Sequence, residues 1–210
     1  MNGRSGFRFA ALAALAALAL LLLAMGAALR PVLPADTTAP AVLNETEIGF
    51  VQDMVAHHGH ALVLTQRLAA DADPFVVGLA GQIADSQRTE LGMLLGWLRL
   101  AGAPVVNPRP MAWLPDTGGG HRHSAADSVR AMPGSATAAE LDELAAARGS
   151  EAEIGFLRLM RRHHAGGVDM AAAADGVLTG GEVERAAREM VRTQGQEIAM
   201  MSLLLDRRGV

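Results

Sequence analysis

The feature that most constrains this chain is a segment that occurs twice in the same register. The tetrapeptide Glu-Ile-Gly-Phe at 47–50 recurs at 153–156, and a Met-x-x-His-His motif follows each copy, at 54–58 and at 160–164. Farther along, after one inserted residue, Gln87 and Glu90 correspond to Gln194 and Glu197. A self-match of this length indicates an internal duplication, so we expect the chain to fold as two related units.

Each unit is predicted to consist of two helices. Half of the residues are hydrophobic but only 3% are aromatic, so the core must be built mainly from Ala, Leu, Val, Ile and Met. Ala and Leu are strong helix formers. Asp73 and Pro74 are typical of a helix start, and Thr137 with Glu140 predicts a capping box before a further short helix. The expected helices cover 45–70, 74–100, 137–148, 150–174 and 180–207.

Two such hairpins predict an all-α body. A single hairpin cannot bury both faces of its helices, whereas two hairpins can close on each other as a four-helix bundle. We therefore expect a bundle with pseudo-two-fold symmetry between the copies. The domain at 44–210 divides into copy one (44–102), a Pro- and Gly-rich connector (103–149) and copy two (150–207).

The N-terminus is predicted to direct the chain out of the cytoplasm. Arg4 and Arg8 precede an uncharged apolar run from Phe9 to Leu29, and about 20 apolar residues suffice to span a bilayer as a helix. The two arginines should stay on the cytoplasmic side, which places the body in the periplasm or outside the cell.

Two interpretations of this N-terminal segment compete. Residues 1–30 are either a signal anchor that stays in the membrane, which we favour, or a signal peptide cut near Ala28 or Ala35. In the second case the body is secreted. Residues 31–43 are rich in Pro, Thr and Ala and predict an extended linker.

Composition excludes several classes of function. There is no cysteine, so disulfide scaffolds, Cys-type zinc sites, thiolate nucleophiles and iron–sulfur clusters are ruled out. The net charge of −4 is mild, and no basic block with interleaved aromatics supports nucleic-acid binding. The di-iron bundle motif needs Glu three residues before His, where this chain has Met54 and Met160. No catalytic constellation is found, so we do not expect an enzyme.

The repeated motif has the chemistry of a metal site. Positions three and four apart share a helix face, so each Met-x-x-His-His motif gathers its thioether and imidazoles on one side of a helix. Imidazole suits copper, zinc, iron and nickel, and thioether favours Cu(I). We predict copper binding, with these ligands: His57, His58, His163, His164, Met54, Met160 and Met170. Weaker candidates are His60, Glu90, Glu197 and Met201.

The connector contains a second set of metal-binding residue types, namely Met111, His121, His123 and Met132. For His121 and His123 the better interpretation is a pair of solvated loop histidines. The whole prediction also has a structural alternative, because methionine at helical spacing is more often core filler. Paired histidines can hydrogen-bond Glu or Gln across a bundle, in a structural or interaction protein that binds no metal. Homo-oligomers and protein partners stay open.

These residues resemble a known family. Phe50, followed by the first Met-x-x-His-His motif, and Phe156, followed by the second, are similar to the DUF305 family of exported bacterial proteins. Met132-Pro133-Gly134 and the closing Gln194-x-x-Glu197 also resemble it. The resemblance covers nearly all of 44–207. It implies a ferritin-like four-helix bundle and, from some relatives, periplasmic copper binding. Leu64 and the pair Gly166-Gly167 depart from the family pattern; the first should weaken a thioether site, and the second should loosen its helix.

Overall fold

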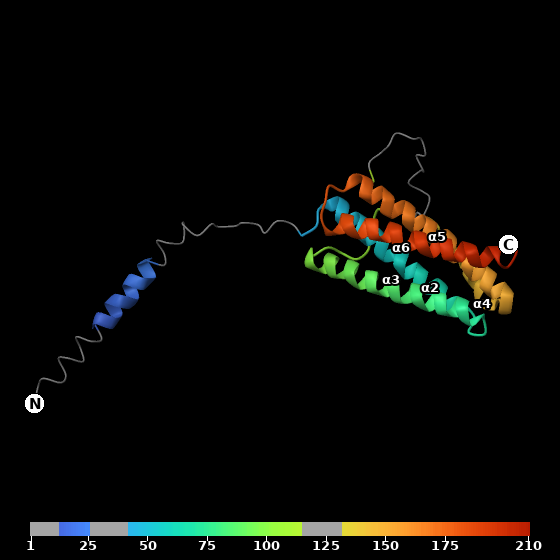
Figure 1. Ribbon diagram of the computed structural model, residues 1–210. Coiled ribbons are helices and arrows are strands. Elements are labelled where there is room, and N and C mark those ends of the chain that lie inside the picture. The colour runs from blue at the N-terminus through green and yellow to red at the C-terminus, as the bar shows by residue number, and fades with distance from the viewer. Residues whose placement is uncertain (1–12, 26–41, 115–131) are drawn as a thin grey trace, which may run out of the picture. The chain divides into compact units, whose positions relative to one another are not determined.

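The computed structural model describes residues 13–25, 42–114 and 132–210, and these residues form helices and connecting turns with no strand. The predicted all-helical character is therefore confirmed for the described part of the chain. The chain divides into two units, 1–41 and 42–210. The second unit contains the helices labelled in Figure 1: α2 (Glu45–Arg67), α3 (Pro74–Leu100), α4 (Ala138–Ala146), α5 (Gly149–Val177) and α6 (Glu182–Asp206).

Local sequence explains where these helices begin. Asp73 caps α3 by accepting a hydrogen bond from the backbone N–H of Phe75 (2.8 Å), with Pro74 at the first position, as predicted. Thr137 and Glu140 form the predicted capping box of α4. A second capping box, between Asn44 and Glu47, begins α2 and was not predicted.

The four long helices pack as two neighbouring pairs, α2 with α3 and α5 with α6, and α2 also lies against α5 (Figure 1). All four contribute to each of two apolar clusters. The first core cluster includes Phe50, Leu94, Met170 and Met190, and the second includes Ala61, Ile83, Phe156 and Met201. Burial of these faces, at roughly 25 cal/mol per Å² of apolar surface, is the main force that holds the helices together.

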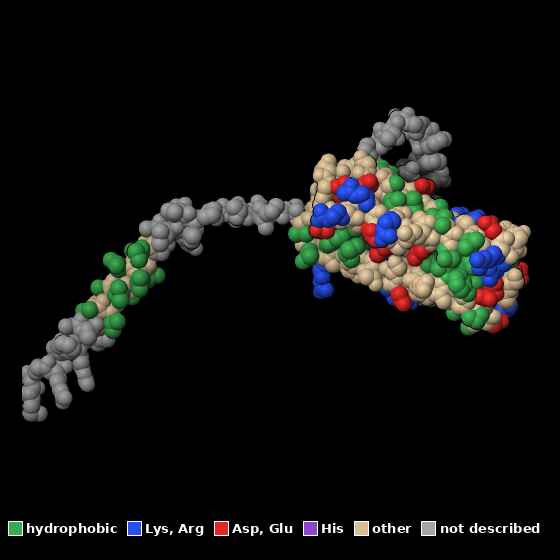
Figure 2. Space-filling view, in the orientation of Figure 1, with side chains coloured by type: hydrophobic (Ala, Val, Ile, Leu, Met, Phe, Trp, Pro, Cys, Tyr) green, Lys and Arg blue, Asp and Glu red, His purple; other side chains and the backbone are tan. Residues whose placement is uncertain are grey.

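The first unit is described only at 13–25, which is helical and exposed along its length. Figure 2 shows these residues as a mostly hydrophobic segment. Among the described residues, no helix combines the length and apolar character needed to cross a membrane. The remaining parts of the predicted span, 9–12 and 26–29, and the predicted cleavage positions lie outside the described residues.

Candidate metal site

A polar layer crosses the middle of the helix assembly, between the two core clusters. Along α2, the first cluster ends at Val55 and the second resumes at Ala61; along α5, the gap lies between Met160 and Met170. Histidine, glutamine and glutamate fill these gaps on all four long helices. We call this set the histidine layer: His57, His58, Gln87, Glu90, His163, His164, Gln194 and Glu197. The duplicated motif therefore places both of its copies in one layer.

The second histidine of each pair forms a hydrogen bond within its own hairpin. The Nε2–H of His58 donates to Glu90 (2.5 Å), and that of His164 donates to Glu197 (2.7 Å). Both imidazoles are fully buried, whereas both carboxylates are partly exposed. Charge-assisted bonds of this kind fix the orientation of each ring and leave its Nδ1 free.

The first histidine of each pair meets its counterpart across the α2–α5 contact. The rings of His57 and His163 lie with their centroids 3.8 Å apart and their planes at 31°. Burial, followed by the neighbouring histidines, lowers the pKa of His57 to about 3, and the same causes lower the pKa of His163 even further. Both rings are therefore neutral at ordinary pH, which is the protonation state that binds a metal.

Several nitrogens in this layer have no hydrogen-bond partner among the described residues. Both ring nitrogens of His163 are of this kind, as is the Nδ1 of His57, His58, His60 and His164. Both amide atoms of the buried Gln194 are also unpartnered. An unpaired buried polar group costs about 1–3 kcal/mol, so such a concentration indicates a site that accommodates a metal ion or internal water.

His60 belongs to the site more closely than the sequence suggested. Its ring centroid lies 5.4 Å from that of His163. With metal–nitrogen bonds of about 2.0 Å, two imidazoles on one ion hold their ring centres roughly 5–6 Å apart. The distance between the rings of His60 and His163 fits two ligands of a single ion. The rings of His57 and His163 are stacked more closely and must move apart before both can bind the same ion.

The predicted methionine ligands flank the histidine layer on both sides. Met54 and Met170 lie in the first core cluster, and Met160 and Met201 lie in the second; all four are fully buried. Each also has an ordinary role as core filler. Within the described part of the chain, no group of three His, Asp or Glu side chains is already arranged to hold a metal ion. Metal binding therefore requires side chains of the layer to change rotamer.

The two glycines expected to loosen α5 have a different role. The helix runs without interruption through Gly166 and Gly167. A Cβ on Gly166 would lie 2.1 Å from the carbonyl oxygen of Pro133, and one on Gly167 would lie 2.3 Å from Oε1 of Gln194. Both glycines thus make room for groups that pack directly against the site.

The connector is held on α2 by a residue one turn before His57. The buried carboxylate of Asp53 accepts hydrogen bonds from Asn107 Nδ2 (2.9 Å), Met111 N (2.6 Å) and Trp113 Nε1 (2.9 Å). Burial raises its pKa, and the three hydrogen bonds oppose this effect. Met111, with φ 63°, is fixed here, and Met132 packs on the first core cluster. His121 and His123 lie outside the described residues.

Comparison with known proteins gives a consistent family assignment. The sequence model of the family described as "Domain of unknown function (DUF305)" matches residues 47–205. A DUF305 protein from Streptomyces coelicolor, of known structure, is 37% identical with a TM-score of 0.68, over 79% of this chain and 93% of that one. A DUF305 fragment from Deinococcus radiodurans is 33% identical with a TM-score of 0.63, over 78% and 97%.

A more distant structural neighbour is CopM in its Cu(II)-bound form. It is 22% identical with a TM-score of 0.58, over 77% of this chain and 96% of that one. At this identity the likeness concerns the fold alone. No curated protein matches the chain.

Proposed function

This chain belongs to the DUF305 family, and we propose that it binds copper through its histidine layer, as an exported protein of ferritin-like four-helix architecture. The observation that carries the proposal is the set of buried, neutral imidazoles with unpartnered nitrogens, flanked by methionines on both sides. Imidazole and thioether together favour copper over harder metals. CopM, which shares the fold, is described in Cu(II)-bound and Cu(I)-bound forms.

In this proposal the histidines, glutamates and methionines have different roles. His57 and His163 offer free nitrogens within the layer, and the adjoining His60 offers a third. Their neighbours His58 and His164 hold Glu90 and Glu197 at its partly exposed rim. Met54, Met160, Met170 and Met201 supply sulfur from the two core clusters. A bound Cu(I) ion would be stabilised by the soft thioethers and would need no proton release from rings that are already neutral.

The test is a copper titration of the detergent-purified full-length chain, with a chromophoric Cu(I) chelator as competitor under reducing, oxygen-free conditions. We expect the His57→Gln/His163→Gln variant to lose at least about 100-fold in affinity, because removing even supporting residues of metal sites costs 10–100-fold. Asp85→Asn, at an exposed position on α3, is the control and should bind as the wild type does. Equal affinities in wild type and double variant, with both folded by circular dichroism, would refute the copper site.

A second candidate function rests on a different observation. The hydrogen bonds of His58 to Glu90 and His164 to Glu197 are those expected of histidines that hold helices together without a metal. In that case the protein is a structural or interaction bundle, and we expect no enzymatic activity under either proposal. Two measurements together would support this second function. The wild-type protein would take up no copper, and His58→Gln/His164→Gln would unfold more easily than the wild type when no metal is present.

Membrane attachment is part of the proposal and rests on the sequence of the N-terminus. Arg4, Arg8 and the uncharged run to Leu29 favour a signal anchor with the body in the periplasm or outside the cell. The Streptomyces coelicolor relative is thought to be a secreted protein. We expect the chain from native membranes to keep its N-terminus and to resist extraction by high salt. Mature protein beginning near residue 29 or 36, recovered in the soluble fraction, would establish cleavage instead.

A further inference from the structure

A short segment before α4 crosses the histidine layer. We call residues 132–136 the strap. The Pro133 carbonyl accepts the Nε2–H of His57 (3.3 Å). A carbonyl only accepts, so the His57 ring must carry its proton on Nε2, the nitrogen that faces the strap. The Nδ1 of His57 is then unprotonated, and it has no other partner among the described residues.

The strap lies directly on the backbone of α5. Gly134 has φ +76°, and a Cβ there would lie 2.4 Å from the Arg162 carbonyl oxygen and 2.9 Å from His163 Cα. On the helix side, a Cβ at Gly166 would lie 2.1 Å from the Pro133 oxygen and 2.3 Å from its carbonyl carbon. Two glycines facing each other thus allow a backbone-to-backbone approach that any larger residue prevents. The strap leaves no room for an ion to pass between itself and this part of α5.

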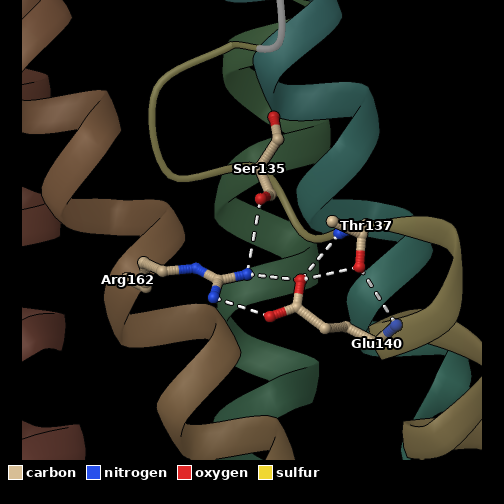
Figure 3. Close-up of polar contacts among 4 residues, drawn as sticks. All are labelled: Ser135, Thr137, Glu140 and Arg162. Atoms are coloured by element: carbon tan, nitrogen blue, oxygen red, sulfur yellow. Dashed lines mark hydrogen bonds and ion pairs between the residues drawn. The ribbon is translucent and has the colours of Figure 1, made fainter.

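One ion pair holds the strap at its exposed edge. Arg162 donates to both carboxylate oxygens of Glu140 (2.7 and 2.8 Å) and also to the Ser135 carbonyl (3.3 Å) (Figure 3). Glu140 in turn accepts from the backbone N–H of Thr137, where the strap joins α4. Figure 3 shows these four residues as one connected set between α5 and the start of α4. Arg162 is adjacent to His163, so the ion pair is anchored on the helix that bears the site.

We propose that the strap is a positioning element and a gate for the histidine layer: its Pro133 carbonyl selects Nδ1 of His57 as a metal-binding atom, and the Arg162–Glu140 pair controls copper access. Metal-bound histidines commonly donate their second N–H to a carbonyl, which fixes ring orientation and tautomer. The gating part rests on the proposed copper function, whereas the tautomer selection does not. Opening the strap exposes the layer from the side of α4.

Two variants open the strap, each with a matched control. Gly166→Ala pushes against Pro133 while favouring the helix, and Gly176→Ala, in the same helix with nothing within 4 Å of its Cβ, is its control. Glu140→Gln removes the ion pair but keeps the capping box, since Gln also serves at that position. Its control is Glu189→Gln, which removes the exposed Arg192–Glu189 pair on α6. All four are made in the full-length chain.

Two measurements test the proposal. Nitrogen-15 NMR of the metal-free protein should show His57 as the Nε2–H tautomer in the wild type and both controls, and as a tautomer mixture in Gly166→Ala. Chelator-competition stopped flow should show copper release accelerated about 2- to 5-fold in Glu140→Gln, the range expected for a half-exposed ion pair, and more in Gly166→Ala. Equilibrium copper affinity in Glu140→Gln should change less than the release rate.

The outcomes separate this proposal from the one on which it rests. A wild type that binds no copper overturns the copper function and the gate together, yet leaves the tautomer measurement to decide the positioning role. Copper binding with release rates equal in Glu140→Gln, Gly166→Ala and their controls overturns the gate alone. A wild type in which His57 is an Nδ1–H tautomer overturns the positioning role.

Discussion

Between about pH 6.5 and about pH 4.5 the metal-free protein should lose roughly 5 kcal/mol of its free energy of unfolding, as much as many domains possess. Burial lowers the pKa of both His57 and His163 far below the ordinary value of 6.5. In the unfolded chain both rings take up a proton below that value, whereas in the folded chain they stay neutral. Each ring that takes up a proton only in the unfolded chain lowers the free energy of unfolding by about 1.4 kcal/mol per pH unit. Two such rings lower it by about 5 kcal/mol over two units.

The sign of this effect follows from the direction of the shift. A histidine with a lowered folded-state pKa is most favourable to folding above 6.5 and becomes unfavourable as the pH falls toward its folded value, about 3 for His57. Urea denaturation at several pH values, followed by circular dichroism, measures the loss. In His57→Gln/His163→Gln the slope should fall by about 2.7 kcal/mol per pH unit, because glutamine does not titrate. A wild-type stability that is flat across this range would contradict the buried, neutral state of the two rings.

Replacing Asp53 by alanine should destabilise the protein by about 3–4 kcal/mol. The carboxylate accepts three hydrogen bonds from the connector, and all three donors are partly buried. Truncation leaves these donors unpaired and detaches residues 107–113 from α2. Burial of the Asp53 charge, which raises its pKa, offsets part of the stability that the three hydrogen bonds provide. The expected decrease in the free energy of unfolding is therefore smaller than three charge-assisted bonds would suggest.

Asp85→Ala is the matched control for this measurement. Asp85 is an exposed aspartate on α3, and its carboxylate accepts a hydrogen bond from Arg88, one turn later on the same helix. Its loss should change the free energy of unfolding by less than about 0.5 kcal/mol. Urea midpoints at neutral pH compare the two variants. If Asp53→Ala is no less stable than Asp85→Ala, then Asp53 does not anchor the connector.

Local signals were sufficient to predict the helices. The helix starts at Asp73–Pro74 and at the Thr137–Glu140 capping box depend on contacts between residues two or three positions apart. Such contacts can be predicted from the sequence. The duplicated motif also predicted which residues share a face, and its histidines from both copies do lie in one layer, with Met54 and Met160 on either side of it. Glu90 and Glu197 are predicted only as weaker metal ligands; in the structure they accept hydrogen bonds from His58 and His164.

Contacts made by the connector could not be predicted from sequence. Asp53 accepts hydrogen bonds from residues more than 50 positions away in the sequence. Hydrophobic periodicity does not predict partners at such a separation. The same holds for Pro133 and His57, which are 76 positions apart. Gly166 was interpreted from helix propensity alone, as a weak point in α5. Its actual role depends on a backbone that approaches from outside the helix, which propensity does not describe.

The stack of His57 on His163 places the same residue of each copy face to face, as a two-fold axis would do in a symmetric dimer. A single ancestral hairpin that paired with itself would have had this contact, with two identical halves around it. When two such hairpins are joined in one chain, a connector links them. A single connector lies on one side of the two-fold axis, so it breaks the symmetry. The equivalent of His60 in the second copy is Gly166, so one copy has an imidazole where the other has a glycine against which the strap packs. A duplicated chain can therefore differ between the two halves of its centre at a pair of equivalent positions, which two identical chains of a symmetric dimer cannot do.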